Sequence, residues 1–217
     1  MLNHLSIRGI MFDMDNTVLR SSIDFPGMKQ GVYSYLQEHR LLPDSISWTS
    51  CTSSQLIELA REYGSGEEQW LPGVWKVVTE YEQAGMKGAG LEPGVREVLA
   101  ELHGRYPLVI LTNNAYSAAM TALVETGVES YFDHVIGREQ MIRLKPAPDG
   151  VRYVHKLYPQ IPPEEWLFIG DSWIDGKAAQ AGGSQFLSYC GDNAELKSND
   201  VPVIGCISRM DELFDYL

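Results

Sequence analysis

From residue 91 to the C-terminus, short apolar segments alternate with longer segments of helical periodicity. Apolar runs of a few residues bounded by polar or turn residues are typical of buried strands, and apolar residues three or four apart predict helices. The predicted strands are 107–111, 134–136, 166–169, 185–189 and 201–207, and the predicted helices are 95–102, 115–126, 148–158, 174–181 and 211–217. Strands that alternate with helices predict an α/β protein: a mostly parallel sheet with helices on both faces.

The segment from residue 21 to residue 88 has a different pattern, with almost no apolar alternation. Helical periodicity covers 28–39, 53–63 and 74–83, and Ser53 or Ser54 is a candidate cap for the second helix. This segment separates a first strand at 10–12 from the rest of the sheet, so it is predicted to be an all-helical insertion. We therefore expect a core domain at 1–20 and 89–217, and a helical domain at 21–88.

The charge balance limits the classes of partner. The chain of 217 residues carries 29 acidic and 17 basic side chains, a net charge of -12. Nucleic acids and anionic membranes both require a basic surface, so neither is expected as a general partner. A small phosphorylated substrate is compatible with this charge, because one lysine and a metal ion reverse the field locally.

The N-terminal residues and the cysteines indicate a cellular compartment. No long apolar segment follows the N-terminus, so neither a signal peptide nor a transmembrane helix is predicted, and we expect a cytoplasmic protein. The three cysteines, Cys51, Cys190 and Cys206, have no close spacing. They are predicted to be free, buried thiols in a reducing cytosol.

The first predicted strand ends in two carboxylates, Asp13 and Asp15, that are separated by one residue. Two like charges at the end of a buried strand require compensation. Mg²⁺ is the best candidate, because it binds carboxylate oxygens and retains water for a phosphate. The carboxyl edge of an open α/β sheet is also where such folds bind ligands.

Polar residues follow three further segments of the predicted core. Thr112 and Asn113 follow the second strand, Lys145 precedes a proline, and Asp171 and Asp175 follow the strand at 166–169. If these segments meet at one edge, four carboxylates surround one lysine and cannot all stay ionised without a metal. The pattern therefore predicts a metal-assisted reaction at a phosphoryl group.

These motifs, in this order, resemble those of the haloacid dehalogenase superfamily, in the branch with a helical cap inserted after the first motif. The matching motifs are Asp13-Met14-Asp15-Asn16-Thr17, Thr112-Asn113-Asn114, Lys145-Pro146 and Gly170-Asp171-Ser172-Trp173-Ile174-Asp175. The resemblance covers nearly the whole chain. It implies a Rossmann-like parallel sheet with helices on both faces, and an all-helical cap domain.

The resemblance also implies a role for each motif residue. Asp13 is the expected nucleophile, which becomes an aspartyl-phosphate, and Asp15 is the expected general acid and base. Thr112 and the backbone of Asn113 are expected to bind phosphoryl oxygens, and Lys145 to offset the charge of the phosphoryl group and of Asp13.

Mg²⁺ is the cofactor that the resemblance implies. Asp13, Asp171 and the backbone carbonyl of Asp15 are the expected ligands. Asp175 is expected either to bind the metal or to orient its waters.

The expected activity is that of a Mg²⁺-dependent phosphatase similar to phosphoglycolate phosphatases, acting on a small phosphorylated metabolite. The resemblance first suggests phosphoglycolate-like or sugar-phosphate esters. The acid at position 15 favours phosphate esters over carbon–halogen bonds, because a halide leaves without a proton. A phosphomutase similar to beta-phosphoglucomutase, and a catalytically idle binding or regulatory module, are the alternatives. Both a monomer and a homodimer are compatible with the sequence.

Overall fold

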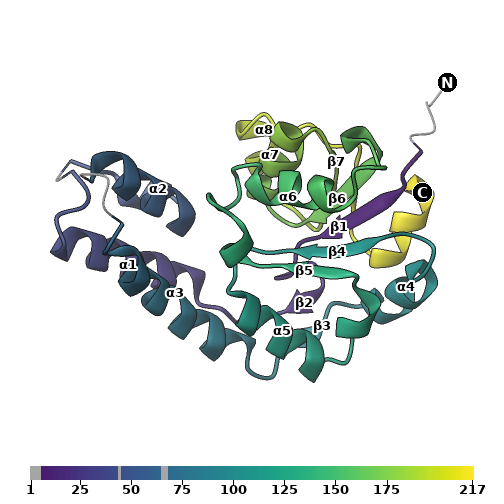
Figure 1. Cartoon of the computed structure of the whole chain (residues 1–217), viewed down its shortest axis with the longest axis horizontal. Helices are drawn as coiled ribbons and strands as arrows, with labels where there is room; N and C mark the ends of the chain where they lie inside the picture. Colours follow the sequence, from purple (N-terminus) through teal and green to yellow (C-terminus); the bar gives the residue numbers. More distant parts are fainter. Residues whose placement is uncertain (1–5, 44, 65–67) are drawn as a thin grey trace. The chain divides into compact units, whose positions relative to one another are not determined.

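The computed structural model describes residues 6–43, 45–64 and 68–217 (Figure 1). The chain forms two compact units. The larger unit combines the residues up to Ser21 with Gly88–Leu217, and the smaller unit is Ser22–Lys87. Residues 1–5 of the predicted core domain, and residues 44 and 65–67 of the predicted helical domain, lie outside the described residues.

The larger unit contains a six-stranded sheet with the strand order β5-β4-β1-β6-β7-β8, and all its pairs are parallel. The strands are β1 Gly9–Phe12, β4 Leu108–Leu111, β5 His134–Ile136, β6 Trp166–Gly170, β7 Gln185–Tyr189 and β8 Gly205–Ile207. Every residue of β1, β4 and β6 is buried, as continuous apolar strands are when both faces of a parallel sheet are covered. The predicted α/β class is confirmed.

Helices cover both faces of this sheet (Figure 1). One face carries α4 Val95–Leu102 and α5 Tyr116–Glu125. The other carries α6 Asp149–Leu157, α7 Trp173–Gly182 and α8 Asn193–Ser198. The order of the strands therefore reverses at β1, and in open α/β sheets such a reversal point at the carboxyl edge is where ligands usually bind.

The C-terminal part differs from the prediction in three elements. The last strand begins only at Gly205, because Pro202 has no N–H for a ladder and the Val201 N–H donates to the Leu196 carbonyl at 2.9 Å. That bond closes α8, which is too short to show helical periodicity and which the sequence pattern missed. The final segment, Met210–Tyr216, is a 3₁₀-helix.

The cysteines are free, as expected, but the prediction that they are buried was wrong. Cys190 and Cys206 are exposed, and Cys51 is half-buried. Cys206 lies in β8 at the edge of the sheet, and Cys190 lies just beyond the end of β7, so neither reaches the core.

The smaller unit is helical in its described residues. It contains α1 Phe25–Glu38, α2 Ser53–Tyr63, α3 Leu71–Met86 and a short 3₁₀-helix, Trp48–Ser50. Helix α1 packs against both α2 and α3 and buries one side chain per turn. These buried side chains are Met28, Val32 and Leu36.

Helices α1 and α3 begin three residues before their predicted starts, and the cap of α2 differs from the predicted one. Helix α1 begins at Phe25 because the Asp24 carboxylate accepts a hydrogen bond from the Gly27 N–H at 2.9 Å, and the first turn tolerates a proline. The cap of α2 is Thr52, not Ser53 or Ser54. Its hydroxyl accepts from the Gln55 N–H at 3.2 Å, and the Gln55 side chain accepts from the Thr52 N–H at 2.8 Å.

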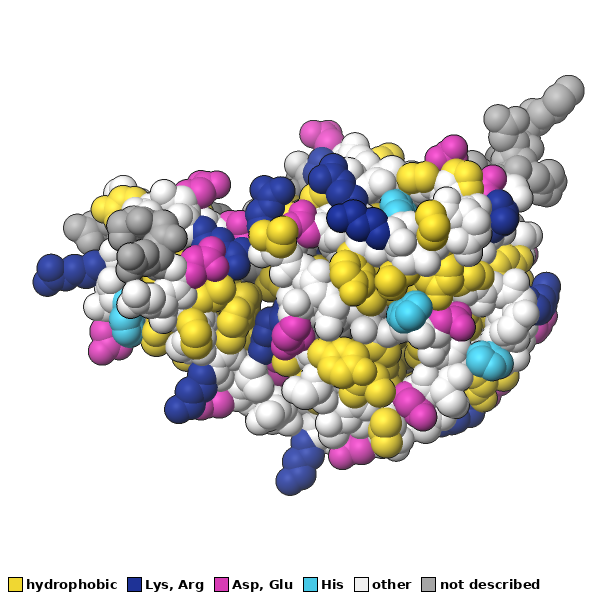
Figure 2. Space-filling view, in the orientation of Figure 1, with side chains coloured by type: hydrophobic (Ala, Val, Ile, Leu, Met, Phe, Trp, Pro, Cys, Tyr) yellow, Lys and Arg dark blue, Asp and Glu magenta, His cyan; other side chains and the backbone are white. Residues whose placement is uncertain are grey.

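The helices and the surface bear on possible partners. Within the described ranges, every helix is too short or too polar to cross a membrane. On the face shown in Figure 2, the Lys and Arg side chains are interspersed with Asp and Glu side chains. Together with the net charge of -12, this distribution gives that face no basic character of the kind that nucleic acids bind.

Gly9→Ala tests the packing of the central strand. A Cβ at this position would lie 2.6 Å from the ring of Trp166, which is fully buried. We expect the variant to lose about 1–3 kcal/mol of unfolding free energy through overpacking, measured by urea denaturation. Gly90→Ala is the control, because no atom lies within 4 Å of its Cβ. Equal stabilities for the two variants would contradict the packing argument.

Candidate active site

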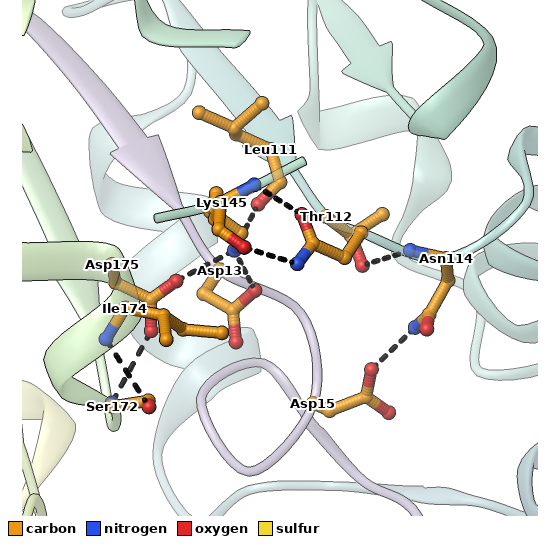
Figure 3. A network of polar contacts seen from close by, with 10 residues as sticks. Asp13, Asp15, Leu111, Thr112, Asn114, Lys145, Ser172, Ile174 and Asp175 are labelled. Carbon is orange, nitrogen blue, oxygen red and sulfur yellow. Dashed lines mark hydrogen bonds and ion pairs between the residues drawn. The ribbon is translucent and has the colours of Figure 1, made fainter. Parts of the chain in front are cut away.

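The ends of three neighbouring strands bring their polar residues to one edge of the sheet (Figure 3). Asp13 follows β1, Thr112 follows β4, and Asp171 follows β6. The Asp13 N–H donates to the Ile169 carbonyl at 2.8 Å, and the Thr112 N–H donates to the Ile136 carbonyl at 3.0 Å. Backbone pairing therefore continues to the first residue beyond β1 and β4, and it fixes where the side chains of Asp13 and Thr112 begin.

The buried ammonium group of Lys145 lies at the centre of the site. It donates to Asp13 Oδ1 at 2.5 Å, to Asp175 Oδ1 at 2.6 Å and to the Leu111 carbonyl at 2.8 Å. A lysine has three N–H donors, so these three acceptors determine its orientation. Burial by itself lowers the pKa of Lys145, but the two carboxylates outweigh burial and raise it, so the group is permanently charged.

The Asn113 side chain holds the main chain of Lys145. Its Oδ1 accepts from the Lys145 N–H at 2.9 Å, and its Nδ2 donates to the Lys145 carbonyl at 3.0 Å. The sequence prediction gave Asn113 a backbone role toward the phosphoryl group. The structure adds a side-chain role, which is to join the loop after β4 to the segment that carries the lysine.

Asp13, Asp171 and Asp175 form an acidic cluster, in which each offers a carboxylate oxygen within 4.8 Å of the others. Burial, followed by the charge of Asp13 and then that of Asp175, raises the pKa of Asp171 to about 8. Burial and the charge of Asp13 raise the pKa of Asp175 to about 7. Lys145 alone therefore does not neutralise the cluster, and a hard divalent cation with oxygen ligands fits the remaining negative charge.

The carboxylates of this cluster differ in how many of their oxygens already accept hydrogen bonds. Asp175 Oδ1 accepts from Lys145, and its Oδ2 accepts from the Ser172 N–H at 3.2 Å. Asp13 uses only Oδ1 for Lys145, among the hydrogen bonds of the described residues. Asp13 is thus better suited than Asp175 to bind a metal directly.

Gly170 allows the close approach of Asp175 to β6. A Cβ at Gly170 would lie 2.6 Å from Asp175 Oδ2 and 2.7 Å from its Cβ. Ser172 then begins α7 with a capping box in which Asp175 is the third helical residue. The same carboxylate therefore caps the helix and binds the lysine, which explains why it is buried.

The carboxyl group of Asp15 lies outside the acidic cluster and contacts Asn114 instead (Figure 3). Asn114 Nδ2 donates a hydrogen bond to Asp15 Oδ2. Burial and the charge of Asp13 raise the pKa of Asp15 to about 6. An aspartate with this pKa exchanges a proton near neutral pH, as a general acid and base must.

Asn114 also fixes the hydroxyl group of Thr112. The Asn114 N–H donates to Thr112 Oγ1 at 3.2 Å. Because Oγ1 is the acceptor in this bond, the hydroxyl proton of Thr112 stays available for another acceptor. Sequence reasoning did not select Asn114 as a site residue. The available signal was a third polar residue after a buried strand, which requires a partner once it is buried.

Comparison with known proteins identifies the family. Residues 10–188 match the model of the haloacid dehalogenase-like hydrolases. The chain belongs to this family. The predicted resemblance is thereby confirmed, and the match spans all the motifs that carry it.

Relatives within the haloacid dehalogenase-like hydrolases cover most of the chain. A phosphoglycolate phosphatase of Cereibacter sphaeroides is 25% identical and covers 96% of this chain and 97% of its own. A phosphoglycolate phosphatase of Photobacterium profundum is 30% identical and covers 81% and 80%. The solved structure of a HAD-superfamily hydrolase from Geobacter sulfurreducens has a TM-score of 0.63 at 21% identity, covering 97% of this chain and 100% of that chain. This last likeness supports the fold.

The raised pKa values predict how stability depends on pH without metal. An unfolded aspartate titrates near 3.8, whereas Asp15, Asp175 and Asp171 titrate at about 6, 7 and 8 in the folded chain. Between about pH 4 and about pH 8, the folded state therefore binds more protons than the unfolded state. The stabilisation that these three groups contribute is complete below about pH 4 and is lost as the pH rises through their folded pKa values of about 6 to 8. We expect the melting temperature in the presence of a chelator to fall between pH 5 and about pH 8.5.

Two comparisons test whether the acidic cluster causes this fall in melting temperature: the Asp171→Asn variant and the addition of excess Mg²⁺. The variant should show a weaker fall, because one titrating carboxyl is absent. Excess Mg²⁺ should raise the melting temperature of the unmodified protein more at high pH than at low pH, since ionised carboxylates bind the metal. A pH profile that Asp171→Asn leaves unchanged would contradict the assignment.

Proposed function

We propose that the protein is a Mg²⁺-dependent phosphatase that hydrolyses a small phosphorylated metabolite through an aspartyl-phosphate intermediate. The proposal rests on one observation: Asp13 accepts a hydrogen bond from the Lys145 ammonium within a cluster of three carboxylates, while a further acid, Asp15, with a pKa of about 6, lies outside that cluster. This arrangement separates a nucleophile from an acid and base. The phosphatase relatives support the same chemistry.

In the proposed first step, a carboxylate oxygen of Asp13 bonds to phosphorus and the bond from phosphorus to the leaving oxygen breaks. Asp15 gives its proton to that oxygen, which departs as an alcohol. In the second step, water bonds to phosphorus, Asp15 takes the proton of that water, and Asp13 is released with inorganic phosphate. The Lys145 ammonium donates to Asp13 Oδ1 and offsets the negative charge of the departing carboxylate.

Two donors of the loop after β4 are proposed to bind the phosphoryl oxygens. Thr112 has a hydroxyl proton that is not used in its bond with Asn114, and the Asn113 N–H lies next to it in sequence. Both residues directly follow β4, and the pairing of β4 with β1 fixes its position in the sheet. Donors placed in advance of the reaction stabilise charge without reorganisation.

The residues that would hold Mg²⁺ are Asp13, Asp171 and the backbone carbonyl of Asp15. Asp175, both of whose oxygens already accept hydrogen bonds, would orient the metal waters. The bound ion would supply positive charge to the phosphoryl oxygens.

The smaller unit, Ser22–Lys87, is proposed to be the cap domain that selects the leaving group. It is inserted between the first motif and the rest of the core, and it contributes none of the motif residues. Phosphoglycolate-like and sugar-phosphate esters are the first substrates to test, since relatives over most of the chain are phosphoglycolate phosphatases.

A phosphate-release screen tests the proposed reaction. The purified protein with Mg²⁺ should release inorganic phosphate from at least one ester among 2-phosphoglycolate, sugar phosphates and other small metabolites. Asp13→Asn should lower kcat by more than about 10³-fold, because it removes the nucleophile. Wild-type phosphate release by this variant would exclude Asp13 as the nucleophile. Accumulation of an isomerised phosphoester in place of free phosphate would indicate a mutase.

Removal of the metal is a separate test. Treatment with EDTA followed by gel filtration should abolish phosphate release, and added Mg²⁺ should restore it, because Lys145 alone does not neutralise the three carboxylates of the cluster. The measurement is the initial rate on the best substrate before and after restoration. Full activity in the chelated protein would exclude the metal role.

A further inference from the structure

Asn114 is held on three sides. Its side chain is buried, with 5% exposure, and its Nδ2 donates to Asp15 Oδ2. Its N–H donates to Thr112 Oγ1 at 3.2 Å, and its carbonyl accepts from the Arg138 N–H at 2.9 Å. Two hydrogen bonds therefore hold the main chain of Asn114, and its side-chain amide points toward Asp15 (Figure 3).

The two oxygens of Asp15 have different surroundings. Oδ2 accepts from Asn114, whereas Oδ1 is buried and has no hydrogen-bond partner among the described residues. An amide nitrogen can only donate, so Oδ2 stays an acceptor whether Asp15 is protonated or not. When Asp15 is neutral, its proton therefore lies on Oδ1.

We propose that Asn114 is a positioning residue for the proton transfer by Asp15, and that it makes Oδ1 the oxygen that carries the proton. The inference rests on the proposed phosphatase function. When the Asp13 oxygen bonds to phosphorus and the bond to the leaving oxygen breaks, the Oδ1 proton moves to the leaving oxygen and Asp15 becomes a carboxylate. Asn114 acts only through Asp15 and takes no part in bond making.

The test compares two small substrates that differ in their need for a proton. Ethyl phosphate loses a basic alkoxide and needs an acid, whereas acetyl phosphate loses acetate and does not. Asn114→Leu removes the donor at nearly constant volume. We expect it to lower kcat/KM for ethyl phosphate by about 10²-fold, the lower range of general acid catalysis, and to leave kcat/KM for acetyl phosphate within about threefold. An equal loss on both substrates would overturn the proposal.

Two further variants control for indirect effects. Asn199→Leu makes the same substitution at a partly exposed asparagine whose side chain donates to the Glu195 carbonyl at 2.9 Å, and it should change neither rate. In an Asp15→Asn background, adding Asn114→Leu should cause no further loss on ethyl phosphate. An additional loss of about tenfold or more in kcat/KM for ethyl phosphate would show that Asn114 does not act through Asp15.

A failure of the variant to fold and a failure of the proposed phosphatase function are distinguished from a failure of the Asn114 proposal. If Asn114→Leu does not fold, Asn114→Ala replaces it, and the same contrast between the two substrates is required. If the unmodified protein hydrolyses neither compound nor any other ester, the proposed function fails. If it hydrolyses both and the contrast is missing, only the role of Asn114 fails.

Discussion

The ion pairs of Lys145 with Asp13 and Asp175 are the interaction on which the arrangement of the site depends. The ammonium group is buried and its donors go to groups that follow or end three different strands. Removing one partner of such a buried pair typically costs about 3–5 kcal/mol, because the other charge stays buried. The sheet must therefore place Asp13, Leu111 and Asp175 correctly for the lysine to be accommodated, and the lysine in turn holds the loops together.

The charge balance around that lysine links the structure to its chemistry. Burial and the charge of Asp13 raise the pKa values of Asp171 and Asp175, because one ammonium does not neutralise the three carboxylates of the cluster. A bound divalent cation would balance this charge and would supply the positive charge that the proposed phosphoryl transfer requires. Asp15 lies outside the cluster and accepts from Asn114, and its proposed role is to move protons. The division of roles between the two acids of the first motif thus follows from their neighbours.

Much of the fold was predictable because its signals are local. Strands such as β1, β4 and β6 are continuous apolar runs, and this pattern directly reflects burial on both faces. The pattern failed for α8, which has six residues and no full apolar period. It also failed for 201–204, because Pro202 has no N–H for the ladder and the strand begins only at Gly205. The cap of α2 was also misplaced, because three adjacent hydroxyl residues compete for one capping position and only the backbone angles decide between them.

The sequence by itself determined the fold class, the family and the residues that carry the proposed chemistry, because strand periodicity and the motifs are properties of neighbouring residues. The tertiary structure decided which groups those residues meet. The bond from Asn114 to Asp15 spans 99 positions, and the contact between Asn113 and the main chain of Lys145 spans 32. Such contacts arise only when parallel strands place distant loops at one edge, so the partner of each acid, and hence its pKa, was readable only from the folded chain.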